Sequence, residues 1–270
     1  MTREFLMKIS NLTKTYVAAG GRRVHALDSV SLQINPGDAL GIVGESGGGK
    51  STLARTIARL QEPDSGELLL WFRGAPAPCD FTNVAGREFQ QLRRKIQLVF
   101  QDPAASLDAR FTVAGLVEEA VDGAVADRAE RGAIATKWLD RSGVSIKLFN
   151  RYPRELSAGE KQRVAIARAL AAEPELILFD EPTASLDVSI RAGIIKLVRE
   201  LQHELSISYL WISHDLDVIA SVCERTAVLY AGKIVEEISI KNLLNGNAAH
   251  SHTKILAEAG GLFKKPNCSF

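Results

Sequence analysis

The feature that most constrains this chain is the glycine-rich segment Gly44-Glu45-Ser46-Gly47-Gly48-Gly49-Lys50-Ser51. It follows the apolar run from Ala39 to Val43 and precedes apolar residues at helical spacing, which predicts a strand, a loop and a helix. Glycines let backbone N–H groups turn toward phosphate oxygens, and a helix N-terminus favours anions. A plain glycine turn needs no Lys followed by Ser. The segment, with Thr52 after it, therefore predicts a phosphate site where Lys50 reaches the β- and γ-phosphates and Ser51 binds Mg²⁺.

Two carboxylates follow a second apolar run. Leu176 to Phe179 reads as a buried strand, and Asp180 and Glu181 come at its carboxyl end, where ligands bind in open α/β sheets. Alone, the pair reads equally well as a solvated strand end. Together with the phosphate loop, it predicts that Asp180 holds the metal, directly or through water, and that Glu181 is the general base.

Two further polar residues sit at predicted strand ends. His214 follows the strand Ser208 to Ile212, and Gln101 follows the strand Ile96 to Phe100. A single histidine is by default a structural or surface residue. Its place beside the same sheet edge favours contact with the γ-phosphate, and the Gln101 amide oxygen can reach Mg²⁺ or water.

Strand and helix patterns alternate along the chain, and this predicts an α/β fold with a mostly parallel sheet covered on both faces. An antiparallel hairpin is expected near the N-terminus, around Gly20-Gly21, and a helical insert from Thr112 to Arg141. A longer helix starts at Ser157, which suits an N-cap.

Composition excludes several classes of protein. The 33 Lys and Arg nearly cancel the 32 Asp and Glu, leaving a charge of +1 that recruits neither nucleic acid nor anionic lipid by itself. No apolar run reaches the length of a membrane span, and no signal peptide is evident. Cys79, Cys223 and Cys268 are isolated, so a reducing cytosol is expected.

These residues together resemble the ATP-binding subunits of ABC transporters. Leu156-Ser157-Ala158-Gly159-Glu160 resembles the family signature Leu-Ser-Gly-Gly-Gln. Gln101 matches the Q-loop, Ala184 to Asp187 the D-loop and His214 the H-loop, and Tyr16 stands where the family places an aromatic residue against adenine.

The resemblance implies one P-loop NTPase domain with a RecA-like core, an antiparallel β subdomain and an α-helical insert. The expected boundaries are 1–101 and 173–238 for the core, 102–172 for the helical subdomain and 239–270 for a short tail. It also implies a head-to-tail pair of ATPase subunits, in which Ser157 and Gly159 contact the γ-phosphate of ATP bound to the partner. Asp187 is a further expected nucleotide-binding residue. The expected catalytic residues are Glu181, His214 and Lys50.

Two departures from the family pattern lie in the signature. Ala158 replaces a glycine, and Glu160 replaces the usual glutamine, which adds a methyl group and a negative charge near the expected phosphate. Both expected contact residues, Ser157 and Gly159, are present. We therefore expect a working signature with altered affinity.

Several stretches resemble the peptide and nickel importer branch: Val99 to Pro103, Leu186 to Ser189 and His250-Ser251-His252-Thr253-Lys254. The branch implies two permease subunits, an extracytoplasmic solute-binding protein and a place on the cytoplasmic face of the cell membrane. The second ATPase subunit is expected to be a paralogue or an identical chain.

Oligopeptides or dipeptides are the expected cargo, with nickel, another metal chelate or another small solute as the alternative. A soluble ABC ATPase acting on nucleic acid or ribosomes, and a subunit that binds ATP without hydrolysing it, are less favoured. Cys268 is expected to be a spare thiol, and a metal pair of His250 and His252 is disfavoured.

Overall fold

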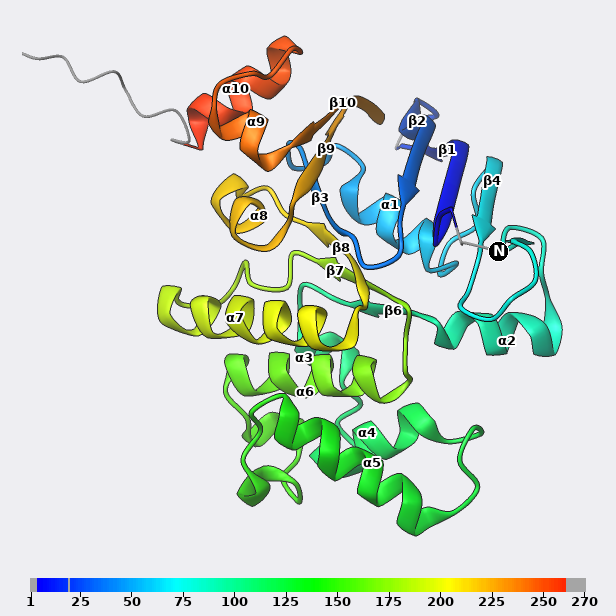
Figure 1. The fold of residues 1–270 in the computed structure, drawn as a ribbon, viewed down its shortest axis with the longest axis vertical. Helices are drawn as coiled ribbons and strands as arrows, with labels where there is room; N and C mark the ends of the chain where they lie inside the picture. The colour runs from blue at the N-terminus through cyan, green and yellow to red at the C-terminus, as the bar shows by residue number, and fades with distance from the viewer. Residues whose placement is uncertain (1–3, 19, 261–270) are drawn as a thin grey trace, which may run out of the picture.

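The computed structural model describes residues 4–18 and 20–260, which form two sheets with helices packed against them (Figure 1). The smaller sheet is antiparallel and has the order β2-β1-β4-β5. Its strands are β1 (Met7–Val17), β2 (Arg23–Ile34), β4 (Ser65–Leu70) and β5 (Cys79–Asp80). The predicted N-terminal hairpin is thus present as β1 and β2, paired from Met7 opposite Ile34 to Val17 opposite Arg23.

The larger sheet has the order β10-β9-β3-β8-β7-β6. Its strands are β3 (Ala39–Val43), β6 (Ile96–Val99), β7 (Leu176–Asp180), β8 (Ser208–Ile212), β9 (Arg225–Tyr230) and β10 (Lys233–Ser239). All neighbouring strands are parallel except β9 and β10. The carboxyl ends of β3, β6, β7 and β8 therefore meet at one edge. The α/β prediction with an antiparallel subdomain is confirmed.

The central strands β3, β7 and β8 of the larger sheet are buried on both faces. In β7, Ile177 and Phe179 belong to one apolar core, whereas Leu176 and Leu178 belong to the other. Continuous apolar runs are typical of parallel strands covered on both sides, because alternate side chains enter different cores. The first core contains α6 (Ala158–Ala171), α7 (Val188–Leu205) and α8 (Leu216–Val222), and the second contains α1 (Lys50–Ile57) and the smaller sheet.

A group of helices extends from the first face of the sheet. Figure 1 shows α7 below the larger sheet, α6 below α7, and α4 (Val113–Val121) and α5 (Arg128–Arg141) below α6. The expected helical insert is present as α4 and α5, with Thr112 and Asp127 as their N-caps. Short elements connect them to the core: α3 (Pro103–Ser106), η1 (Ile146–Leu148) and η2 (Pro153–Glu155). A further helix, α2 (Gly86–Arg94), lies between β5 and β6 in the chain.

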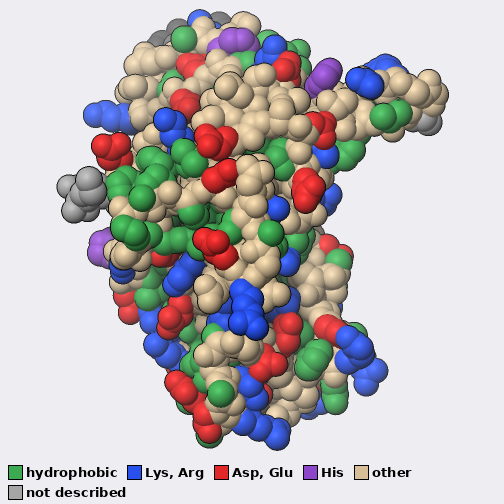
Figure 2. Space-filling model, turned by 90° about the vertical axis from the view of Figure 1, so that its right-hand side faces the viewer, with side chains coloured by type: hydrophobic (Ala, Val, Ile, Leu, Met, Phe, Trp, Pro, Cys, Tyr) green, Lys and Arg blue, Asp and Glu red, His purple; other side chains and the backbone are tan. Residues whose placement is uncertain are grey.

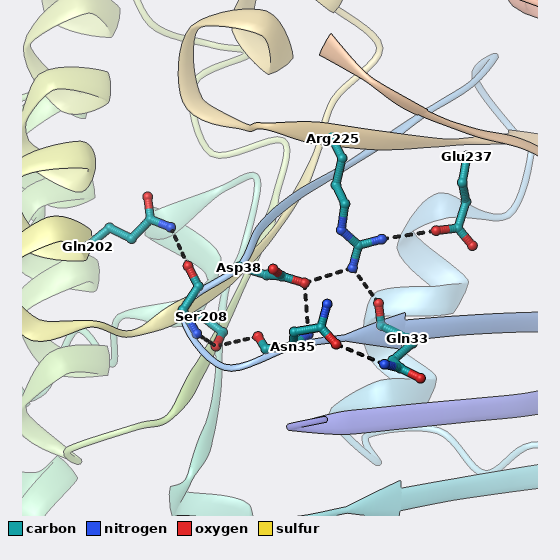
Figure 3. A network of polar contacts seen from close by, with 8 residues as sticks. Gln33, Asn35, Asp38, Gln202, Ser208, Arg225 and Glu237 are labelled. Carbon is teal, nitrogen blue, oxygen red and sulfur yellow. Dashed lines mark hydrogen bonds and ion pairs between the residues drawn. The ribbon is translucent and has the colours of Figure 1, made fainter. Parts of the chain in front are cut away.

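A polar network holds the opposite edge of the larger sheet, away from the carboxyl ends of the parallel strands (Figure 3). Arg225, at the start of β9, donates to the Gln33 carbonyl at 2.5 Å, to Asp38 at 2.7 Å and to Glu237 at 3.0 Å. Ser208, at the start of β8, accepts from Gly37 N at 2.8 Å. Because Gln33 belongs to β2, this network ties the smaller sheet to the larger one.

The C-terminal segment forms two helices that the sequence patterns did not predict, α9 (Ile240–Leu244) and α10 (Ser251–Ala259). Glu236 on β10 accepts hydrogen bonds from the backbone of Ala249 and His250, and the His252 ring stacks on Tyr230 with centroids 3.9 Å apart. Nδ1 of His250 accepts from the backbone N of His252. The two histidines thus support the tail, and Cys268 lies outside the described residues.

The surface carries charges of both signs. Figure 2 shows Lys and Arg side chains interspersed with Asp and Glu over one face of the molecule. Among residues 4–18 and 20–260, no helix combines the length and apolar character that a membrane crossing requires.

Candidate functional site

The glycine-rich loop connects β3 to α1 and packs tightly against other backbone segments. A Cβ on Gly44 would lie 2.1 Å from the carbonyl oxygen of Leu229, and one on Gly49 would lie 2.0 Å from that of Ala26. Gly49 also has a φ of +100°, which glycine adopts without strain. These two glycines are therefore required by packing as well as by any ligand. Gly47, with a φ of +79°, faces open space.

Backbone N–H groups at the start of α1 are available to an anion. The first turn of a helix has no intrahelical acceptors for its N–H groups, and its dipole favours negative charge. Within the described residues, the backbone N–H groups of Lys50, Ser51 and Thr52 form no hydrogen bond to another protein group. Glu45 and Ser46 are exposed at the mouth of the loop.

Lys50 lies back over the loop and is almost fully buried. Its ammonium donates to the carbonyl oxygens of Gly44 and Glu45, both at 2.9 Å. Burial lowers the pKa of Lys50, and the carboxylates of Glu181 and Asp180 oppose that shift. An ammonium held by two neutral carbonyls and close to two acids remains available to a stronger anionic acceptor.

Ser51 and Asp180 meet at the carboxyl end of β7. The Ser51 hydroxyl donates to Oδ1 of Asp180 at 2.9 Å, and Asp180 is 3% exposed. Burial raises the pKa of Asp180, while the hydrogen bond from Ser51 lowers it. A hydroxyl and a carboxylate are hard oxygen ligands of the kind that Mg²⁺ binds, so this pair fits that cation. No cluster of three or more His, Cys, Asp or Glu in the described ranges could hold a metal ion on its own.

Glu181 and His214 lie side by side just after the ends of the neighbouring strands β7 and β8. Oε2 of Glu181 is 3.0 Å from Nδ1 of His214, and the side chains are 15% and 55% exposed, respectively. Glu181 has a φ of +48°, a left-handed conformation that is uncommon for a side chain of this type. Its backbone N donates to the Ile212 carbonyl on β8, which stabilises this conformation. The carboxylate and the imidazole therefore face the same edge of the sheet as Asp180.

Gln101 and Asp187 are exposed residues that follow strands β6 and β7 in the chain. Gln101 is exposed, and β6 ends at Val99, one residue earlier than the sequence predicted. Because Val99 pairs with Phe179, Gln101 follows the strand next to the one that ends in Asp180. Asp187 is the exposed N-cap of α7 and makes no capping bond through its side chain.

Tyr16 lies on β1, opposite Val24 of β2, and its side chain is 42% exposed. Ala26, two residues after Val24, contacts Gly49 of the loop. The Tyr16 hydroxyl donates to Oε1 of Gln61 at 2.5 Å, a contact that sequence spacing alone does not indicate. The smaller sheet therefore contacts the phosphate loop through Ala26, while the Tyr16 hydroxyl bonds to Gln61 in the segment that follows α1.

Ser157 and Gly159 lie at the start of α6, whose apolar side chains pack in the core on the opposite face of the larger sheet from α1. Ser157 is exposed and caps α6, as the sequence predicted. Gly159 is buried, and a Cβ there would lie 2.6 Å from Cγ2 of Ile190. The structure thus brings Lys50, Ser51, Asp180, Glu181 and His214 to one sheet edge and leaves the signature segment facing elsewhere.

The family model that matches this chain, described as ABC transporter, covers residues 27–184. The chain belongs to the ABC transporter family. Oligopeptide transport ATP-binding protein OppF of Bacillus subtilis is 42% identical over 262 residues, covering 95% of this chain and 82% of that protein. OppF of Streptococcus mutans is 38% identical over 259 residues, with the same two coverages. The family resemblance of the sequence is confirmed.

Solved structures of ABC cassettes share the fold. An ATP-binding cassette in a dimeric post-hydrolysis state bound to ADP and Pi has a TM-score of 0.76 and 33% sequence identity, covering 87% of this chain and 98% of that one. CbiO1 from Clostridium perfringens, part of the ABC transporter complex cbiONQ, has a TM-score of 0.75 and 31% identity, covering 90% and 92%. This chain is a nucleotide-binding ABC domain, and the predicted fold class is confirmed.

Some features of this ABC domain were beyond sequence reasoning. The close approach of the loop to Ala26 and Leu229 joins segments that are far apart in the chain. Arg191 on α7 donates to Asp215 at 3.1 Å, next to His214, and nothing in the local pattern signals that pair. The contact between Glu160 and Ser157 does have a sequence signal, because Ser followed three residues later by Glu is the pattern of a capping box.

Proposed function

We propose that this chain is the ATP-hydrolysing motor subunit of a membrane importer for oligopeptides or dipeptides. The observation that carries the proposal is the meeting of Ser51 and Asp180 at 2.9 Å, with Glu181 and His214 at the same sheet edge. The names of the relatives support peptides as the cargo. In this single ABC ATPase domain, residues 1–101 and 173–238 form the core, 102–172 the helical subdomain and 239–270 a short tail.

The loop and the start of α1 bind the phosphates of ATP. Lys50 exchanges its two carbonyl acceptors for phosphate oxygens, and backbone N–H groups of residues 47–52 surround the chain of phosphates. Ser51, Asp180 and Gln101 would hold Mg²⁺, which neutralises charge on the phosphate oxygens when bound. Tyr16 packs against the adenine ring.

Glu181 is the general base. It accepts a proton from the water that attacks the γ-phosphorus, and the bond between that phosphorus and the bridging oxygen breaks as ADP leaves. His214 orients the Glu181 carboxylate through the 3.0 Å contact and contacts the γ-phosphate from the end of β8. Their proximity favours hydrolysis over a purely structural role for ATP.

A second ATPase subunit completes the site. Ser157 and Gly159 lie on the opposite face of the sheet from α1 of their own chain, so they act on the nucleotide bound to a facing subunit. Asp187, exposed at the start of α7, contacts the interface between the two ATPase subunits. A paralogue or a second copy of this chain fills that role.

Two permease subunits attach this chain to the cytoplasmic face of the cell membrane. A groove of about 200 Å³ lies between β6 and α6, next to Gln101, and Arg93, Phe100 and Arg168 are among its lining residues. We place the permease contact in this groove because a movement there reaches Gln101 directly. A solute-binding protein delivers the cargo to the permeases, and no nucleic acid takes part.

Transport tests this function directly. Cells that lack this chain should lose uptake of labelled oligopeptides, and the parent chain should restore uptake while the Glu181→Gln variant should not. Recovery of nickel uptake with unchanged peptide uptake would replace the peptide assignment with the nickel alternative. Uptake and ATPase activity at the parent level in Glu181→Gln would overturn the catalytic assignment. Co-purification of two membrane proteins with the tagged chain tests the permease contact.

A further inference from the structure

The signature end of this chain contains an internal carboxylate contact. Oε2 of Glu160 accepts hydrogen bonds from both the backbone N and the hydroxyl of Ser157, each at 2.8 Å. The backbone N of Glu160 donates in turn to the Ser157 hydroxyl at 3.3 Å. Glu160 thus holds both donors that Ser157 can offer.

These bonds compete directly with a bound phosphate. A serine hydroxyl has one hydrogen, so it donates either to Glu160 or to a phosphate oxygen. The start of α6 also favours anions, and the Glu160 carboxylate already lies there as a negative charge. An incoming phosphate is repelled by this carboxylate and must displace it from Ser157 in order to bind there.

No ion pair in the described part of the chain fixes the Glu160 carboxylate. Among the described residues, Glu160 forms no ion pair within 4.0 Å, whereas Glu155 in the preceding turn pairs with Arg151 at 2.8 Å. Glu155 also accepts from the backbone N of Tyr152 at 2.7 Å. Both carboxylates accept a bond from the backbone N three residues earlier. Only Glu160 bonds to Ser157, the residue that is expected to contact the nucleotide.

We infer that Glu160 is a positioning residue that competes with the γ-phosphate of the facing subunit for Ser157, and so raises the ATP concentration at which the two subunits close. This inference rests on the proposed function, in which Ser157 contacts that phosphate. Ala158 is exposed at the first position of α6 and makes no such contact, so the altered affinity originates at Glu160.

The test uses the transporter complex purified through a tag on this chain, with ATPase rate measured against ATP concentration. Glu160→Gln keeps an oxygen that accepts the capping bonds but removes the charge. We expect its half-saturating ATP concentration to fall about fivefold, while kcat stays within about twofold of the parent. Glu155→Gln is the matched control and should leave the curve in place. An unchanged or higher half-saturating concentration in Glu160→Gln overturns the inference.

Ser157→Ala separates this inference from the proposed function. Loss of ATPase in Ser157→Ala, with no shift in Glu160→Gln, overturns only the role of Glu160. Parent-level activity in Ser157→Ala overturns the proposed contact of Ser157 itself. In the double variant, measured by ATP binding instead of hydrolysis, the shift caused by Glu160→Gln should be smaller than in the parent background, because the hydroxyl for which the two groups compete is absent. Equal melting temperatures of the parent and Glu160→Gln exclude a purely structural effect.

Discussion

The Ser51 hydroxyl donates a hydrogen bond of 2.9 Å to Oδ1 of Asp180, although the two residues are 129 positions apart in the chain. The bond joins the start of α1 to the end of β7 and brings a buried carboxylate to the phosphate loop. A buried carboxylate without a bound cation lowers the free energy of unfolding of the nucleotide-free protein, because burial disfavours its charged form. The same feature that prepares the site therefore lowers stability without ligand.

Asp180→Asn should stabilise the nucleotide-free protein. The amide keeps an oxygen to accept from Ser51 but removes the buried charge, so we expect about 1 kcal/mol of added stability, or roughly 2–4 °C in Tm. Burial raises the pKa of Asp180 in the folded state above its value in the unfolded chain. The free energy of unfolding of the parent therefore falls as pH rises through the folded-state pKa, because the buried carboxyl must then ionise. The difference in Tm between variant and parent should thus be largest at neutral pH and vanish in acid. Thermal melts between pH 4 and pH 8 check this, and a variant less stable than the parent at neutral pH contradicts it.

Glu181→Gln should lower kcat for ATP hydrolysis by about 10²- to 10⁴-fold, the usual contribution of a general base. Nucleotide binding should persist, since the loop and Lys50 are unchanged, and ATP should therefore trap a closed pair of subunits. Single-turnover hydrolysis and light scattering measure the two effects. Glu200→Gln, on the exposed face of α7, serves as the control and should match the parent in both.

Gly49→Ala should be far more damaging than Gly47→Ala. The new Cβ at residue 49 meets the Ala26 carbonyl at 2.0 Å, and backbone must move to relieve the overlap. At residue 47 only the positive φ opposes the substitution, at a cost of about 1–2 kcal/mol. Urea unfolding should show a loss of about 3 kcal/mol or more for Gly49→Ala. Equal losses in the two variants would show that the contact with β2 is not rigid.

Arg225→Ala should destabilise the protein without affecting the nucleotide site. The substitution leaves Asp38 and the Gln33 carbonyl without their guanidinium donor at the far edge of the sheet (Figure 3). We expect a loss of about 1–3 kcal/mol and an unchanged KM for ATP. Arg22→Ala, at an exposed position in the loop between β1 and β2, is the control and should unfold with the parent. A change in KM for ATP in Arg225→Ala would contradict the separation of the network from the site.

The phosphate loop and the acidic strand end could be predicted because each is a local signal. Strand, glycines, Lys and Ser are contiguous between Ala39 and Ser51, and Asp180 and Glu181 directly follow an apolar run. The tail could not be predicted in this way. Its helices depend on Glu236, which accepts bonds from Ala249 and His250, and on the stack of His252 against Tyr230. Those partners lie on strands that only the folded sheet brings close.

The sequence by itself determined which residue types stand at the ends of strands and helices, because hydrophobic periodicity and the geometry of glycine act over a few positions. The tertiary structure alone decided how those ends meet. Parallel pairing in register places Val99, Phe179 and Trp211 at one level, so the ends of β6, β7 and β8 form a single edge. It also set Ser157 on the opposite face of that sheet from α1 and let the Glu160 carboxylate take both of its donors. Such contacts depend on strand order and on which face a helix covers, and no local spacing specifies either one.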